Sequence, residues 1–124
     1  MTPAYLCVLI AAGLPYILVG YAKLSTKGYN NNKPREFLEK LEGQSKRAHY
    51  AHLNSFEAFP AFASGVIIAH LAGANPHSIS SLAVLFVIFR ILYGICYIMD
   101  NASLRTLMWF GGFACMIGLF ILAL

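Results

Sequence analysis

Charged side chains are scarce in this chain of 124 residues. Only 11% of the residues are Asp, Glu, Lys or Arg, whereas 59% are hydrophobic. Soluble globular domains carry about 25% charged residues, so this composition argues against an ordinary small soluble domain. It is typical of a membrane protein with several spans, and the length allows one domain, residues 1–124.

Cysteine is also rare, and its placement excludes two kinds of site. Cys7, Cys96 and Cys115 stand singly inside apolar runs, without the spacing of metal ligands. We therefore expect no disulfide framework and no metal site, and we interpret the three cysteines as packing residues.

Long apolar runs, in contrast, are present and predict an all-α fold. Residues 3–24, 79–99 and 104–124 each reach the length of about 20 residues that crosses the hydrocarbon core. A fourth run, 58–72, is too short alone but long enough if its helix begins near residue 46. The prediction is an integral membrane four-helix transmembrane bundle with helices at about 3–24, 46–72, 79–99 and 104–124. The first run lacks the features of a cleaved signal, so we expect it to remain as a span.

The basic residues are concentrated in one loop. Residues 23–47 contain seven Lys or Arg against three Glu, and the rest of the chain sums to zero, so the whole formal charge of +4 lies there. Basic loops stay on the cytoplasmic side, which predicts that loop 25–45 is inside and both termini are outside. A basic balance in such a loop indicates a membrane surface as partner and not nucleic acid.

Within this loop, the segment PREFLEKLEG favours a short interfacial helix. Pro34 suits a first helical position, Phe37, Leu38 and Leu41 form a small apolar face, and Gly43 is expected to end the helix. A flexible solvated loop is the alternative.

Polar residues form two lines in the expected bundle. At helical spacing, the first polar line comprises Arg47, Tyr50, Asn54, Glu57 and Ala61, and the second comprises Arg90, Tyr93, Tyr97 and Asp100. With 1.5 Å of rise per residue, Glu57 lies about 15 Å above Arg47 and Arg90 about 15 Å above Asp100. Glu57 and Arg90 are therefore expected at similar depth, as an ion pair.

Two interpretations of these lines remain open. A buried ion pair that holds the helices in register explains Glu57 and Arg90 alone. It does not explain why further polar residues, Arg105 included, point at the same inner half of the bundle with an excess of positive charge. Such clusters favour a site for a small anionic ligand. Because four helices cannot enclose both lines and still face lipid all round, we expect a homo-oligomer with sites between protomers.

These residues resemble the membrane-associated proteins of eicosanoid and glutathione metabolism, the MAPEG family. The resemblance rests on RAHYAHLNSFEAFPAF (47–62) and FRILYGICYIMDNASLRT (89–106), and the order of spans fits over nearly the whole chain. It implies a homotrimer that binds glutathione between neighbouring subunits near the cytoplasmic face. The chain is most similar to a divergent bacterial branch, which implies the bacterial inner membrane.

The resemblance also implies roles for individual residues. Arg105 is similar to the family's arginine at the start of the last helix, whose guanidinium would stabilise the glutathione thiolate and lower the pKa of the thiol. Glutathione itself would be held by Arg47, Asn54, Glu57, Arg90, Tyr93 and Tyr97. The chain departs from the better-known enzymes at Tyr50, where many carry a second arginine, and at Tyr93, where some carry histidine.

The function that follows is a glutathione-dependent transferase or peroxidase acting on hydrophobic electrophiles that partition from the lipid, a detoxification activity. The alternative, from another class, is a non-enzymatic lipid-binding or scaffold protein that keeps the family's fold and polar cluster. A small transporter or channel fits less well, because the polar lines stop halfway across the membrane and the outer half of each helix is apolar.

Overall fold

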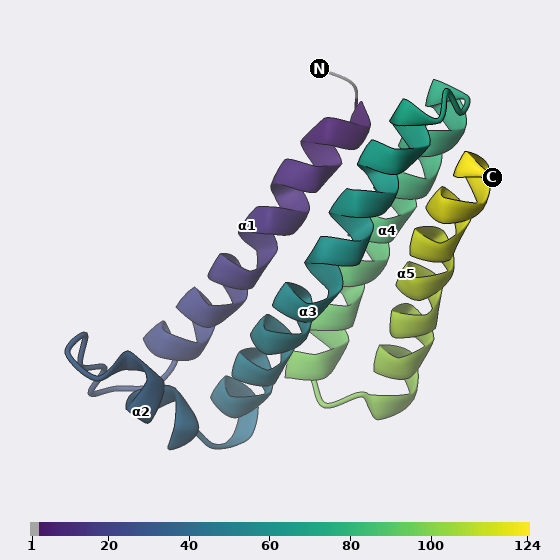
Figure 1. Cartoon of the computed structure of the whole chain (residues 1–124). Helices are drawn as coiled ribbons and strands as arrows, with labels where there is room; N and C mark the ends of the chain where they lie inside the picture. Colours follow the sequence, from purple (N-terminus) through teal and green to yellow (C-terminus); the bar gives the residue numbers. More distant parts are fainter. Residues whose placement is uncertain (1–2) are drawn as a thin grey trace.

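The computed structural model describes residues 3–124, and the described part of the chain is helical. It forms four long helices and one short helix, whose arrangement is drawn in Figure 1. In chain order they are α1 (Pro3–Leu24), α2 (Pro34–Glu39), α3 (Gly43–Leu71), α4 (Pro76–Ile98) and α5 (Ala102–Ala123). The four long helices match the predicted order, and α2 matches the predicted helix in the loop.

The long helices alternate in direction, so the two ends of the chain lie at the same end of the bundle (Figure 1). Helices α3 and α4 form the centre: each packs against the other and against both α1 and α5. Helices α1 and α5 are not among the pairs that pack together closely, so they lie on opposite sides of this central pair.

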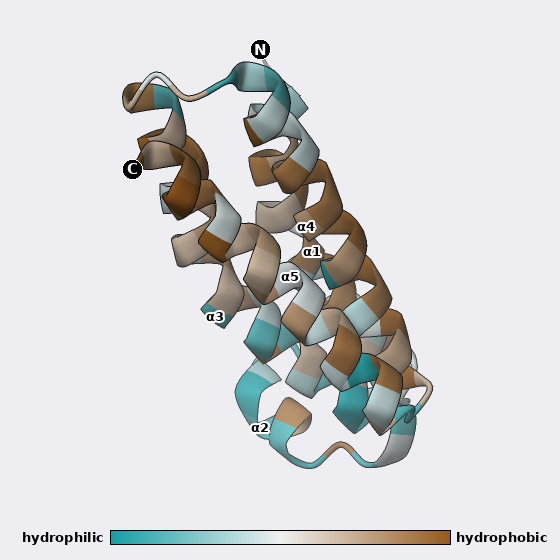
Figure 2. Ribbon diagram, turned by 90° about the vertical axis from the view of Figure 1, so that its right-hand side faces the viewer, coloured by the Kyte–Doolittle hydropathy of each residue, from teal (hydrophilic) through white to brown (hydrophobic). Residues whose placement is uncertain are grey.

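Three of the helices, α1, α4 and α5, are long and apolar enough to cross a membrane. Helix α3 has 29 residues and is longer than any of them, but its N-terminal half carries the first polar line. Figure 2 shows the result: hydrophobic ribbon dominates most of the bundle, whereas hydrophilic residues gather at the end where α2 lies. The apolar surface and these three helices mark the chain as an integral membrane protein.

Asparagine residues explain why α4 and α5 begin earlier than predicted. The Asn75 side chain accepts hydrogen bonds from the backbone N–H groups of His77 and Ser78, at 2.9 and 3.2 Å. Asn101 accepts one from Leu104 at 3.2 Å. These N-cap contacts satisfy backbone donors that have no partner within the helix. Helix α4 therefore starts at Pro76 instead of residue 79, and α5 at Ala102 instead of residue 104.

The predicted end of the short helix was wrong. Helix α2 ends at Glu39, and Gly43 is instead the first residue of α3, with φ of +59°. Glycine adopts this left-handed conformation without the steric cost that a Cβ imposes, which lets the chain turn sharply into α3. Helix α3 thus begins three residues before the predicted residue 46.

The apolar face of α2 contacts the bundle and not an open surface. Leu38 and Leu41 are buried, and they pack in one cluster with Ala22 of α1 and Ala48 of α3. The Lys46 ammonium donates to the carbonyl oxygens of Leu38 and Glu39 at 3.2 and 2.7 Å, which satisfies acceptors at the end of α2. This helix therefore closes the end of the bundle between α1 and α3.

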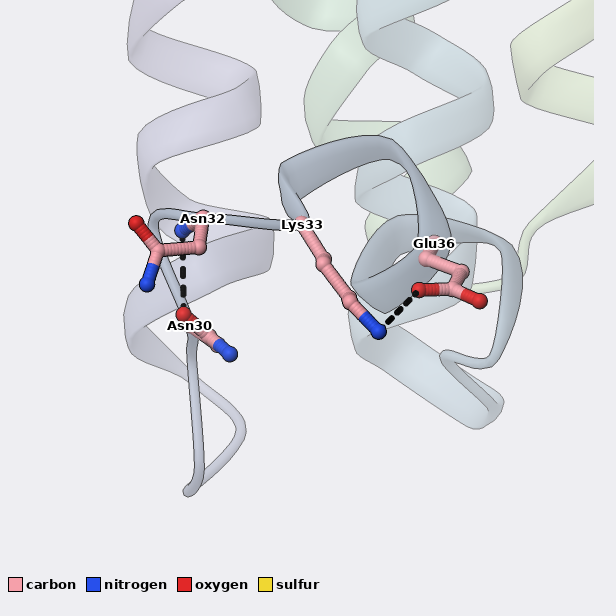
Figure 3. A network of polar contacts seen from close by, with 4 residues as sticks. All are labelled: Asn30, Asn32, Lys33 and Glu36. Carbon is pink, nitrogen blue, oxygen red and sulfur yellow. Dashed lines mark hydrogen bonds and ion pairs between the residues drawn. The ribbon is translucent and has the colours of Figure 1, made fainter.

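The loop that precedes α2 is held to α3 at its start, where the Ser25 and Thr26 hydroxyls lie 2.6 and 2.8 Å from Oγ of Ser45, and by short-range contacts further along. The Asn30 side chain accepts from the backbone N–H of Asn32 at 2.9 Å, and the Lys33 ammonium lies 3.8 Å from the Glu36 carboxylate. Figure 3 marks both contacts with dashed lines. Both side chains of that ion pair are more than half exposed, so the pair adds about 0.5 kcal/mol at most to stability.

The largest cluster of the core contains an aromatic pair between α3 and α4. The rings of Phe62 and Phe86 are parallel with centroids 3.9 Å apart, and Phe62 is fully buried. Phe62→Ala is expected to lower the free energy of unfolding by about 2 kcal/mol. This is less than the cost in a soluble core, because lipid tails are as apolar as the protein interior and only packing is lost.

Thermal unfolding in detergent checks this expectation. Phe110→Ala is the matched control, since Phe110 is 57% exposed on α5 and its loss leaves no internal cavity. Equal melting temperatures for the two variants would contradict the packing account.

Candidate polar site between α3, α4 and α5

The site is built on a contact between the two polar lines. Arg90 of α4 donates from Nη2 to Oδ1 of Asn54 on α3, at 2.7 Å, although the two residues are 36 positions apart. Arg90 is only 4% exposed. A buried guanidinium needs hydrogen-bonding partners, because leaving a charge unsolvated costs several kcal/mol. The Asn54 amide supplies one such partner.

The expected direct ion pair between Glu57 and Arg90 is not what the structure contains. Asn54 lies between them: its Nδ2 donates to Oε2 of Glu57 at 3.4 Å while its Oδ1 accepts from Arg90. Among residues 3–124 the only ion pair within 4.0 Å is Lys33 with Glu36. The amide thus links the two charges as a relay, and Glu57 keeps one oxygen without a protein partner in the described chain.

The aromatic members of the second polar line connect Arg90 to Arg105. The Arg90 guanidinium lies 4.2 Å from the centroid of the Tyr93 ring, and the Arg105 guanidinium lies 4.5 Å from that of Tyr97. The two tyrosine rings meet edge to face at 5.7 Å. Cation and ring attract each other at such distances, so both arginines are held in fixed orientations. The structure therefore brings Arg90, Tyr93, Tyr97 and Arg105 into one continuous series.

Arg47, in contrast, does not face this cluster. Its Nε and Nη2 both donate to the carbonyl oxygen of Ile98, at 3.2 and 3.0 Å. Ile98 is the last residue of α4, where carbonyl groups lack partners within the helix and the helix dipole favours a cation. Arg47 thus fastens α3 to the C-terminal end of α4. The contact to glutathione that the resemblance implied for Arg47 stays a prediction.

Arg47→Ala is expected to destabilise the protein by about 2 kcal/mol, because two charge-assisted hydrogen bonds are lost. Arg47→Lys should recover part of this loss, since a lysine keeps the charge but not the fork of two donors. Thermal unfolding of the two variants measures both effects. Arg35→Ala is the control, because Arg35 is an exposed residue of α2. A neutral Arg47→Ala would show that the contact to Ile98 carries no stability.

A cavity of about 240 Å³ opens beside the contact between Asn54 and Arg90. Only three of the predicted site residues line it: Asn54, Glu57 and Arg90. The other lining residues are apolar, and they are Ala58, Ala61, Phe86, Trp109, Phe113 and Met116. The cavity therefore has one polar edge and one extended apolar wall, which suits a ligand with both kinds of surface.

Sequence reasoning missed the apolar wall on α5. Trp109, Phe113 and Met116 follow Arg105 at spacings of four, four and three residues, so all four lie on one helix face. That spacing was visible in the sequence. It did not predict a cavity wall, because aromatic and aliphatic residues in a membrane helix are expected to face lipid wherever no polar residue marks an inner face.

Two histidines lie on the other side of α3. His49 and His52 are buried, their ring centroids are 5.6 Å apart, and the Nδ1 atoms of both lack a hydrogen-bond partner among the described residues. Neither histidine belongs to the first polar line. No group of three or more His, Cys, Asp or Glu side chains able to hold a metal ion occurs within residues 3–124.

Comparison with known proteins gives one result that covers essentially the whole chain. The model of the MAPEG family matches residues 2–124, so it spans every helix and both polar lines. No curated protein and no solved structure matches the chain. With the family match extending over all of the elements that form the site, the chain belongs to the MAPEG family.

Proposed function

We propose that this protein is a membrane-embedded glutathione-dependent transferase or peroxidase that acts on hydrophobic electrophiles. The observation that carries the proposal is the relay from Arg90 through Asn54 to Glu57 at the polar edge of an otherwise apolar cavity. A hydrophilic tripeptide thiol and an apolar acceptor need such neighbouring surfaces. Membership of the MAPEG family supports the same conclusion.

The charges in the cluster suit glutathione, which carries two carboxylates and one ammonium group. Glu57 offers a carboxylate oxygen for the ammonium, and Arg90 offers a cation for a carboxylate. Arg47 is engaged with Ile98, and Tyr50 replaces the family's second arginine, so this chain has fewer free cations for the tripeptide. We therefore expect affinity in the millimolar range.

Arg105 is the group that we assign to the sulfur. Its guanidinium is held over Tyr97 at the inner end of the face that leads to Trp109. A fixed positive charge next to the sulfur favours the thiolate and lowers the pKa of the thiol, which supplies the nucleophile at neutral pH. In transfer to a halogenated acceptor, the sulfur forms a bond to carbon and the halide leaves with its electron pair. The thiol proton has already passed to water.

The cluster also favours a homotrimer with sites between protomers. Glu57 is the middle residue of α3 and is exposed in the single chain, as is Tyr50 at 45%. A charged side chain at that depth is costly in lipid, so a second copy or water must cover it. Covering by a neighbouring protomer completes the site, and native mass spectrometry is expected to find three copies. In this arrangement α3 also crosses the membrane, which brings the number of spans to four. Helix α2 lies on the cytoplasmic side, and both termini lie outside.

Equilibrium binding tests the proposal. Protein in nanodiscs is expected to bind glutathione saturably, and a difference spectrum should show the far-ultraviolet absorbance of a thiolate at neutral pH. S-methyl glutathione is the control ligand: it should compete for the site without giving the thiolate signal. Absence of binding at millimolar glutathione would contradict the enzymatic reading. A copurified lipid in the cavity, with no turnover of any acceptor, would instead support the lipid-binding or scaffold alternative.

A further inference from the structure

Arg105 differs from the other arginines of the polar cluster in how it is held. Arg47 and Arg90 each donate hydrogen bonds to a protein oxygen atom. The Arg105 guanidinium instead lies over the Tyr97 ring, 4.5 Å from its centroid, and no carboxylate within residues 3–124 lies within 4.0 Å of it. The face of an aromatic ring attracts a cation without accepting its N–H groups. This contact therefore leaves the donors of Arg105 free for an anionic ligand.

The Tyr97 ring is itself held in place by a buried neighbour. It meets the Tyr93 ring edge to face, with centroids 5.7 Å apart and an interplanar angle of 83°. Tyr93 is only 5% exposed and packs in one cluster with Leu18 of α1 and Ala51 of α3. Because Tyr93 is enclosed by neighbouring helices, the ring that contacts Arg105 has a defined orientation.

Both residues of this contact belong to one helical hairpin. Two backbone hydrogen bonds close the turn between α4 and α5: the N–H of Asn101 donates to the carbonyl of Cys96, and the carbonyl of Asn101 accepts from the N–H of Arg105, each at 2.9 Å. Asp100 adopts the left-handed conformation common at the end of a helix, with φ of +60°. A single protomer therefore supplies the arginine, the ring and the turn that joins them, and assembly with further copies contributes none of the three.

We propose that Tyr97 is a positioning residue, whose ring holds the Arg105 guanidinium in the orientation that stabilises the glutathione sulfur as a thiolate. The inference rests on the proposed function. It gives Tyr97 a role other than the hydrogen bond to glutathione that the resemblance implied, and the two roles use different parts of the side chain. A hydrogen bond needs the hydroxyl group, whereas attraction of the guanidinium needs only the electron-rich face of the ring.

Two substitutions separate these roles in protein reconstituted in nanodiscs with glutathione. Tyr97→Phe keeps the ring and removes the hydroxyl, so the pH midpoint of the thiolate absorbance should equal that of the wild type. Tyr97→Leu removes the ring and should raise this midpoint by about one pH unit, because a mobile guanidinium loses part of the effect of a nearby opposite charge. Affinity for S-methyl glutathione, which has no thiol, should stay close to that of the wild type in both variants.

Fluorinated phenylalanines at position 97 provide a graded test in a side chain of nearly unchanged shape. Each fluorine withdraws electrons from the ring face and weakens its attraction for a cation. The midpoint should therefore rise stepwise from phenylalanine through a difluoro to a tetrafluoro side chain. The matched control is the same series at Tyr29, whose ring also lies under a cation, the Lys23 ammonium at 4.9 Å, in the loop that precedes α2. The control series should leave the midpoint unchanged.

Each outcome has a distinct meaning. A stepwise rise at position 97 and not at position 29 supports the positioning role, even if Tyr97→Leu fails to fold. A flat series, an unchanged midpoint in folded Tyr97→Leu, or a midpoint that rises as much in Tyr97→Phe as in Tyr97→Leu overturns this role while the proposed function stands. A wild type that gives no thiolate signal with glutathione rejects the proposed function, and the role of Tyr97 with it.

Discussion

Arg105→Ala is expected to lose the glutathione thiolate at neutral pH while retaining most of the affinity for glutathione. The arginine contacts the protein mainly through the face of the Tyr97 ring, so its removal leaves the contact between Asn54 and Arg90 intact. Loss of one group that stabilises a developing anion lowers turnover by about 100-fold to 1,000-fold. The affinity for the whole tripeptide should change less than tenfold.

The pH dependence of this variant gives a second readout. Without the guanidinium, the thiol ionises near the value for a free thiol, about 8.5. Because the deprotonated sulfur is the nucleophile, turnover by Arg105→Ala should rise with pH through that range, whereas the wild type should already be near its plateau at neutral pH. Arg105→Lys, which keeps a charge but not the planar fork, should lie between the two. A variant with an unchanged pH profile would remove Arg105 from the mechanism.

Asn54→Leu is expected to reduce stability by about 3 kcal/mol or more. The substitution fills the same volume with apolar atoms, and it leaves the buried Arg90 guanidinium without the acceptor that it now has at 2.7 Å. Removal of one partner of a buried charge is costly, because desolvation of that charge is then uncompensated. Thermal unfolding in detergent measures the loss, and Leu53→Ala at the exposed neighbouring position is the control.

A second substitution at the same position separates folding from ligand binding. Asn54→Asp keeps an acceptor for Arg90 but removes the donor to Glu57 and adds a negative charge. Its stability should remain close to that of the wild type, whereas its affinity for the anionic tripeptide should fall at least tenfold. Equal stability and equal affinity for glutathione in Asn54→Leu and Asn54→Asp would show that the relay through Asn54 has no separate role in recognition.

The membrane helices could be predicted from the sequence because their signal is long and strong. The chain has three runs of about 20 apolar residues, and a run of this length rarely forms anything other than a transmembrane helix. The meeting of Asn54 with Arg90 was also predictable in outline. Polar residues at three- and four-residue spacing define a face, and antiparallel helices with short connections bring the two faces to the same depth.

The finer contacts could not be predicted, for reasons particular to each residue. Arg47 shares a helix face with Asn54, but its long side chain reaches across to a free carbonyl at the end of α4. Spacing along one helix carries no information about that carbonyl. Glu57 and Arg90 were expected to pair because opposite charges attract. The amide of Asn54, one turn away from Glu57, is closer to Arg90 and makes contact with both.

The proposed function requires that the polar edge of the cavity and Arg105 together hold glutathione in a trimer. The most direct test is a structure of the protein in lipid nanodiscs with glutathione added. We expect three protomers, with glutathione in contact with Asn54, Glu57 and Arg90 and its sulfur beside Arg105. A lipid or detergent tail in the cavity, with no thiol ligand at saturating glutathione, would contradict it.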